Sequence, residues 1–214
     1  MKITNVNVYG MGDTVAAARY PMCTDGLSEE EFSHISALFE TVYLNSQYDG
    51  AEDTNRGTKD FNRLVHLGTA VGGSGHDCAV KGIVVQFDCK APRYWWNQLQ
   101  RYHFIDFVSS CSQMHRIGKL DLETNPDMFP ETIEYTKKVV ERFNNKEITI
   151  DQCLANVPQG IELTARLVTN YLQLKTIYNQ RRTHRSRHWQ EFCDWVETLP
   201  YARDFIIPEK GDKK

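Results

Sequence analysis

Hydrophobic positions along this chain recur with two different spacings, which predict a few strands among several helices. Short β-branched and aromatic runs at residues 1–9 and 83–87 predict strands. An Ala-rich run predicts one or two helical turns at residues 14–20. Apolar residues three or four positions apart predict helices at residues 28–39, 61–67, 94–102, 131–143, 148–155 and 189–196. The longest helical pattern follows Gly160 and runs through Leu163, Leu167, Tyr171, Leu174 and Tyr178. Because strands and helices do not alternate, the predicted class is α+β, with a small mixed sheet and several helices.

Local signals place some ends of these elements. Ser28, followed three residues later by Glu31, forms a capping-box signature for the start of a helix. The polar, Gly- and Asp-rich residues 45–59 predict a long surface loop. Gly-rich residues 71–75 and turn-rich residues 121–130 predict further connections.

Length and composition predict one ordinary globular domain. The 214 residues are 41% hydrophobic and 25% charged, with a net charge of −3. We expect a single domain over residues 1–208 and a flexible tail over 209–214. No apolar run approaches the roughly 20 residues that span a bilayer, so no membrane association is expected. Six scattered cysteines without a C-x-x-C pair favour reduced thiols in a cytoplasmic protein.

The richest candidate chemistry lies between residues 75 and 116. Cations, hydroxyls and amides there surround a strand and an aromatic helix. Side chains of these types beside aromatic rings suit a phosphorylated, planar ligand such as a nucleotide or a flavin. His, Cys, Asp and Glu spacings fit no metal pattern, so no metal site is expected. Ser110, Cys111, Ser112 and His115 lie close together, but no nucleophile motif surrounds them.

One family has a similar order of residues in this stretch. The order is His76, Lys90-Ala91-Pro92, Gln98, Arg101-Tyr102-His103 and Ser110-x-Ser112. It resembles the motifs of the flavin-dependent thymidylate synthases (ThyX). The resemblance continues in Pro158, Asn170, Arg182 and Trp189, and in the Ala-Ala-Arg segment that ends at Arg19.

The resemblance implies a ThyX-like fold, a homotetramer whose neighbouring subunits complete each site, and flavin-dependent methylation of dUMP to dTMP. FAD would be the cofactor, with NADPH and methylenetetrahydrofolate as co-substrates. Arg182 would be catalytic by orienting the pyrimidine. The implied FAD-binding residues are His76, Arg101, His103 and Asn170. The implied nucleotide-binding residues are Gln98, Ser110, Ser112, Arg116, Lys175 and Arg182.

The chain also departs from the family pattern. Met114 and Leu154 stand where ThyX proteins hold the substrate phosphate with arginines, and Tyr102 and His103 replace a His and an Arg. Modification of another pyrimidine nucleotide therefore remains open. So does a protein of a different class, which binds or sequesters nucleotides without catalysis.

The strongest basic segment is residues 180–188, QRRTHRSRH. On a continuous helix, Arg181, His184, Arg185 and His188 would share one face. Such a face suits a solvated helix end, a nucleotide phosphate or an RNA strand. Because the net charge is negative, no nucleic-acid partner is expected.

Overall fold

The computed structural model describes residues 1–120, 122 and 127–207. The chain divides into two compact units. The first holds Met1–Asn5 and Phe87–Leu167, and the second holds Val6–Gln86 and Val168–Lys214. The predicted tail over 209–214 and part of the predicted turn over 121–130 lie outside the described residues. The single domain over 1–208 stays a prediction.

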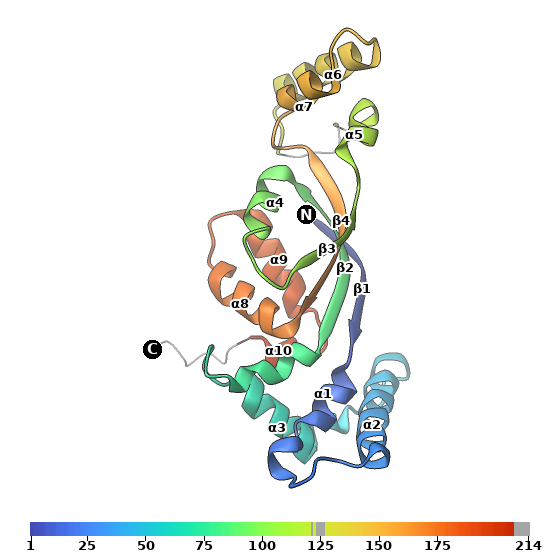
Figure 1. Ribbon diagram of the computed structural model, residues 1–214, viewed down its shortest axis with the longest axis vertical. Coiled ribbons are helices and arrows are strands. Elements are labelled where there is room, and N and C mark those ends of the chain that lie inside the picture. Colours follow the sequence, from blue (N-terminus) through green and yellow to red (C-terminus); the bar gives the residue numbers. More distant parts are fainter. Residues whose placement is uncertain (121, 123–126, 208–214) are drawn as a thin grey trace. The chain divides into compact units, whose positions relative to one another are not determined.

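The strands form one four-stranded sheet with the order β1-β2-β4-β3 (Figure 1). Its members are β1 (Lys2–Tyr9), β2 (Val84–Pro92), β3 (Asp106–Ser110) and β4 (Glu162–Asn170). The predicted mixed sheet is wrong, because the sheet is antiparallel. β3 and β4, for example, are joined by a chain segment that returns at one end of both strands, so they run in opposite directions (Figure 1).

The predicted long helix after Gly160 is wrong over its first half. Glu162–Asn170 is strand β4, and helix α8 begins only at Tyr171 and ends at Arg181. Ala165, Leu167 and Thr169 are buried, whereas the residues between them are half-buried, which is the alternation of a strand. Leu163, Leu167 and Tyr171 are four residues apart, and that spacing returns to the same face in a strand as well as in a helix.

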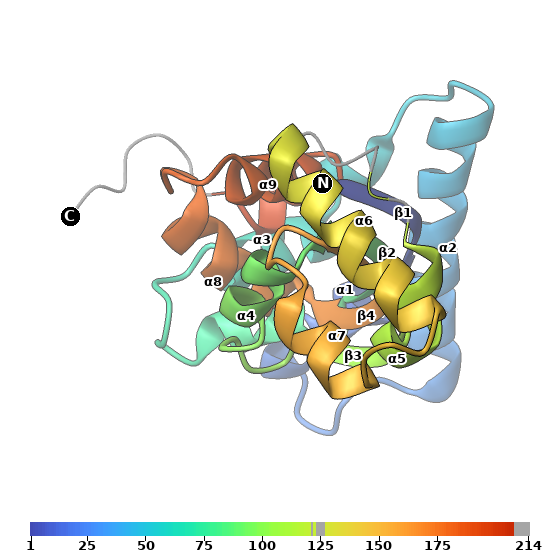
Figure 2. The ribbon, with the colours of Figure 1, turned by 90° about the horizontal axis from the view of Figure 1, so that it is seen from above.

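The helices of the first unit follow β2 and β3. They are α4 (Arg93–Leu99), α5 (Gln113–Arg116), α6 (Pro130–Asn144) and α7 (Ile150–Asn156), with a 3₁₀ turn at Ile117–Lys119. Figure 2 shows α6 and α7 lying side by side. Together with the segments before β4 they bury a small apolar core of Ile117, Leu122, Val139, Cys153, Val157 and Ile161. This core supports the segment that carries α5.

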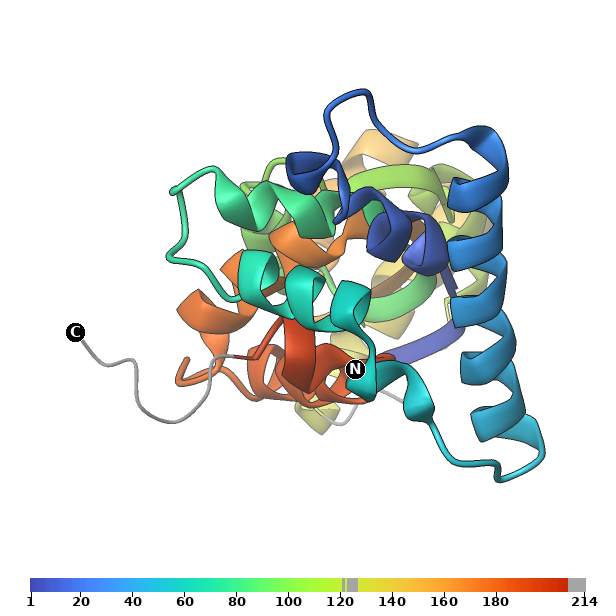
Figure 3. The same ribbon diagram turned by 90° about the horizontal axis from the view of Figure 1, so that it is seen from below.

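The second unit contains the remaining helices. They are α1 (Met11–Ala17), α2 (Glu29–Tyr48), α3 (Lys59–Gly68), α8, α9 (Arg187–Glu197) and α10 (Ala202–Phe205), with 3₁₀ turns at Tyr20–Met22, Thr54–Gly57 and His76–Gly82. α1 packs against both α2 and α3 (Figure 3). The predicted capping box is confirmed, since Ser28 caps α2 and exchanges hydrogen bonds with Glu31.

Two expectations for the second unit hold only in part. α2 continues to Tyr48, so the predicted loop over residues 45–59 is wrong at 45–48, where mostly exposed polar side chains continue the solvent-facing surface of the helix. The basic segment is not one helix, since α8 ends at Arg181 and α9 begins at Arg187. The four basic residues therefore do not share a helical face. No described helix has the length and apolar character that crossing a membrane requires.

Candidate functional site

The junction of β2 and α4 positions the first candidate residues. Pro92 precedes α4 and Ala91 is buried beneath it. The indole Nε1 of Trp96 donates a hydrogen bond to the Ala91 carbonyl at 2.9 Å, and the Arg93 backbone N–H donates to the Ile161 carbonyl at 3.0 Å. These bonds hold the start of α4 against the strands, so the direction in which α4 leaves the sheet is set.

Three of the predicted residues lie on α4 and in the turn after it. Gln98 is half-buried near the end of α4, whereas Arg101 and His103 are exposed in the turn that leads to β3. Phe104 has a positive φ of 61° in that turn. Ile105 is buried next to it and anchors the turn. The two basic side chains are thus presented to solvent by a well-anchored backbone.

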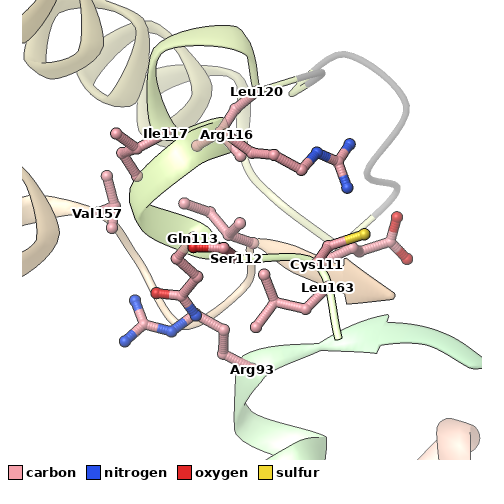
Figure 4. Close-up of a pocket in the computed structure, with 11 residues that line it drawn as sticks. Arg93, Cys111, Ser112, Gln113, Arg116, Ile117, Leu120, Val157 and Leu163 are labelled. Carbon is pink, nitrogen blue, oxygen red and sulfur yellow. The ribbon is translucent and has the colours of Figure 1, made fainter. Parts of the chain in front are cut away.

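Two cavities of the first unit share the segment Cys111–Gln113 and Leu163 as a wall. The wider cavity has a volume of about 230 Å³, and its other lining residues are Trp96, Gln100, Phe107, Ser110, Thr164 and Ala165. The narrower one has about 10 Å³, which is room for one water molecule. Its other lining residues are Arg93, Arg116, Ile117, Leu120, Val157, Ile161 and Glu162 (Figure 4). The structure therefore brings the predicted residues Ser110, Ser112 and Arg116 together.

The two cavities differ in charge. Two arginines line the narrow cavity, and its one carboxylate, Glu162, forms an ion pair with Lys90 at 3.1 Å. The wide cavity is lined by aromatic, hydroxyl, thiol and amide groups without a charged side chain. The narrow cavity therefore favours an anion, and the wide cavity favours a neutral, partly aromatic group.

His76 lies in the second unit. It is the first residue of the 3₁₀ turn His76–Gly82 and follows Gly75, whose φ of 86° favours glycine. The exposed His76 lines a cavity of about 310 Å³ together with Thr14, Tyr20 and Leu67, among others. The Tyr20 ring and the His76 imidazole in one cavity suit a planar ligand.

The other predicted residues of the second unit have partners within that unit. The Asn170 Oδ1 accepts a hydrogen bond from the Gln173 backbone N–H at 2.9 Å and so caps α8. Lys175 is 8% exposed, and its ammonium donates to the carbonyls of Gly68 and Ala70. Their roles in ligand binding stay predictions.

Arg182, the predicted catalytic residue, follows α8 and is bound by two carboxylates of α9. Its guanidinium lies 2.5 Å from Asp194 and 3.3 Å from Glu197. Glu197 also accepts a hydrogen bond from the Tyr178 hydroxyl at 2.8 Å. Burial and this carboxylate together raise the pKa of Tyr178 to about 12. Arg182 is therefore held in a defined orientation, with guanidinium N–H groups left over.

Sequence reasoning missed several residues that line the two cavities of the first unit. Arg93, Gln100, Phe107 and Gln113 carry the relevant polar or aromatic groups. Arg93 directly follows the Lys-Ala-Pro segment, so its place at the start of α4 could have indicated it. Thr164 could have been found only by treating residues 162–170 as a strand. No group of three or more His, Cys, Asp or Glu among the described residues is placed to bind a metal.

Comparison with solved structures identifies the fold. The chain superimposes on the flavin-dependent thymidylate synthase ThyX of Helicobacter pylori, in a crystal structure complexed with FAD and dUMP, with a TM-score of 0.67 and 13% identity. The match covers 96% of this chain and 98% of that chain. A second structure of the same enzyme with FAD and dUMP gives a TM-score of 0.66 and 13% identity, covering 96% and 97%. This chain therefore has a ThyX-like fold. No protein-family model and no curated protein sequence matches it.

Proposed function

We propose that this protein is a flavin-dependent enzyme that modifies a pyrimidine nucleotide, with methylation of dUMP to dTMP as its reaction. The observation that carries the proposal is a fold shared along almost the whole length of both chains with an enzyme complexed with FAD and dUMP. NADPH would reduce the flavin, and methylenetetrahydrofolate would supply the carbon. The flavin supplies the redox chemistry when bound, so this chain's residues bind, orient and stabilise charge.

Each unit, taken by itself, offers groups of the types that FAD needs. Arg101 and His103 are exposed basic groups that suit the pyrophosphate, and the cavity beside His76 and Tyr20 suits a flat ring. Asn170 completes the proposed set. Neither the 310 Å³ cavity nor the 230 Å³ cavity holds a whole two-nucleotide cofactor. As the resemblance to ThyX implies, further copies of the chain, in a homotetramer, would complete each site.

An exposed edge strand supports such an assembly. β3 is the last strand of the sheet, and Phe107 and Val108 on it are 41% and 56% exposed. Exposed apolar edge strands are prone to association. A second copy covering β3 would remove this surface from water.

Nucleotide binding and turnover would use the other predicted residues except Lys175, whose ammonium already donates to two backbone carbonyls. Gln98, Ser110, Ser112 and Arg116 would bind the nucleotide. Arg182 would orient the pyrimidine and polarise its carbonyl. Asp194 and Glu197 would orient the guanidinium for this role. An arginine has five N–H donors and these two contacts use two of them, so the others can bind the pyrimidine.

The visible absorption spectrum of the purified protein, with and without added FAD, tests this function. We expect a bound-flavin spectrum that bleaches on addition of NADPH, and dTMP formation from dUMP and methylenetetrahydrofolate. Arg101→Ala should lose the flavin, whereas Arg203→Ala, at an exposed arginine of α10, should keep it. A colourless protein that ignores added FAD would contradict the proposal.

A second function is favoured by the charges of the site. Met114 and Leu154 carry no charge where ThyX proteins have arginines, and Lys175 is already bound to two carbonyls. A nucleotide-binding protein without catalysis is consistent with both facts. Such a protein would bind dUMP but would neither retain flavin nor form dTMP.

A further inference from the structure

The narrow cavity of the first unit contains two arginines from different elements. Arg93 is the first residue of α4, and Arg116 is the last residue of α5. Figure 4 shows their side chains on two sides of the segment that carries Ser112 and Gln113. Neither guanidinium has an ion pair or a hydrogen bond with any residue that the structure describes. Their charges are therefore available to an anion.

The neighbouring polar groups are neutral donors. Ser112 precedes α5, but its hydroxyl makes no capping hydrogen bond. The Gln113 amide is half-buried against the same cavity and bonds to no residue in the described part of the chain. The one acidic side chain, Glu162, is paired with Lys90. Two cations, a hydroxyl and an amide N–H₂ match the acceptor oxygens of a phosphate group.

The shape of the narrow cavity limits what can enter. Its volume of about 10 Å³ admits one oxygen atom, so a phosphate would sit at its mouth over Ser112 and Gln113. An arginine side chain is long, with several rotatable bonds, and both guanidinium groups can turn towards an anion bound there.

The wide cavity continues from the same wall. Beyond Ser112 and Gln113, about 230 Å³ lie next to Trp96 and Phe107, whose ring centroids are 5.3 Å apart. Gln100, Ser110 and Thr164 add hydrogen-bonding groups without charge. This lining suits the sugar and the base of a mononucleotide.

We propose that Arg93, with Arg116, Ser112 and Gln113, binds the terminal phosphate of a nucleoside monophosphate, whose sugar and base occupy the cavity beside Trp96 and Phe107. The inference rests on the proposed function for the identity of the nucleotide. It adds Arg93 as the residue that distinguishes a nucleotide from a nucleoside, and it fixes the direction in which the ligand lies.

Isothermal titration calorimetry of the full chain with dUMP and with deoxyuridine tests the assignment. We expect dUMP to bind at least tenfold more tightly than deoxyuridine at pH 7.5, where the phosphate is a dianion. Arg93→Ala should weaken dUMP binding about tenfold or more and leave deoxyuridine binding unchanged. Arg93→Lys should recover part of the loss, because it restores the charge without the planar fork.

The controls separate charge from folding and from the flavin. Arg203→Ala removes an exposed arginine of the second unit and should bind dUMP like the parent. Circular dichroism checks that each variant is folded. Titrations with FMN and riboflavin, which differ by one phosphate, test whether the site binds a flavin phosphate instead. If Arg93→Ala weakens FMN binding and leaves dUMP binding unchanged, the site belongs to the flavin and the assignment is overturned.

The calorimetry tests the phosphate site, and the flavin spectrum tests the proposed reaction, so either proposal can fail without the other. A colourless protein whose dUMP binding requires Arg93 would contradict the proposed reaction and uphold this site. An active flavoenzyme whose dUMP affinity is the same in Arg93→Ala would uphold the reaction and overturn this site. Equal affinities for dUMP and deoxyuridine would also overturn it.

Discussion

The ammonium group of Lys175 lies at the carboxyl end of α3. It donates hydrogen bonds to the carbonyl of Gly68, the last residue of α3, at 2.5 Å and to the carbonyl of Ala70, two residues beyond the helix, at 3.0 Å. The last carbonyls of a helix have no partner within it. A cation is favoured at this end of a helix dipole. Burial lowers the pKa of Lys175, and the charge of Asp77 partly opposes the shift. At the scale of the residue, these contacts give Lys175 a structural task.

Replacing Lys175 separates that task from nucleotide binding. We expect Lys175→Met to lower the free energy of unfolding by about 1–2 kcal/mol, because the two carbonyls lose their donor, and to leave the dUMP affinity unchanged. Urea denaturation and calorimetry measure the two quantities. Lys59→Met, at an exposed lysine of the same helix, should change the stability by less than about 0.5 kcal/mol. Weaker dUMP binding with unchanged stability would instead support the predicted ligand contact.

Asp88 supplies a pH-dependent contribution to the stability of the first unit. Its carboxylate accepts hydrogen bonds from the Asn5 amide at 2.5 Å and from Arg166 at 3.2 Å. The Asn5 bond, followed by that of Arg166, lowers the pKa of Asp88. Because the carboxylate is the favoured form in the folded state, its contribution is present above the unfolded pKa of about 3.9 and is lost as the pH falls through the lower, folded pKa.

The corresponding variant is Asp88→Asn. At pH 7 we expect it to lower the free energy of unfolding by about 0.5–1 kcal/mol, since the carboxylate is about a quarter exposed. Well below pH 3.9 the difference between variant and parent should shrink towards zero. Urea denaturation at both pH values measures it, with the exposed Asp25→Asn as control. A difference that grew on acidification would contradict this account.

At the scale of the elements, one glycine sets how closely α1 approaches α2. A Cβ on Gly12 would lie 2.5 Å from the backbone oxygen of Ser36 and 2.8 Å from its hydroxyl. The Gly12 N–H also donates to Glu40 at 2.8 Å. Since the Ser36 oxygen belongs to the backbone of α2, it can give way only if the two helices separate.

We therefore expect Gly12→Ala to destabilise the protein by about 1–3 kcal/mol, although alanine is the better helix former by about 1 kcal/mol. The thermal unfolding midpoint measures the effect. Gly57→Ala is the matched control, because no atom lies within 4 Å of the Cβ position and its φ is not positive. A more stable Gly12→Ala variant would show that the helices can move apart at little cost.

The same scale explains which elements a pattern predicts. α2 has a capping box and α9 buries Trp189, Phe192 and Val196 on one face, so both were predicted. β3 is exposed along its whole length, so it has no alternation of buried residues to indicate a strand. β4 was missed because its leucines satisfy the spacing of a helix and of a strand at once. Only its pairing between β2 and β3 decides between the two.

At the scale of the whole molecule, the ThyX-like fold persists at 13% identity. Folds tolerate such divergence because packing needs apolar residues of suitable volume at the right period, not particular residues. The site is less tolerant, since a phosphate or a flavin needs donors at given positions. The comparison with the solved ThyX structures therefore identifies the fold of this chain, whereas its reaction has to be tested by the flavin and nucleotide experiments.

Strands β1 and β2, most of the helices, and the stretch that carries Ser110, Ser112 and Arg116 could be predicted from the amino-acid sequence. These follow from periodicity, caps and residue chemistry, all of which act between neighbours in the chain. Three features became visible only in the folded chain: residues 162–170 form a strand, Lys175 and Arg182 have partners within the chain, and Arg93 shares a cavity with Gln113. Those features depend on contacts between residues far apart in the sequence, and a pattern among neighbouring residues does not predict such contacts.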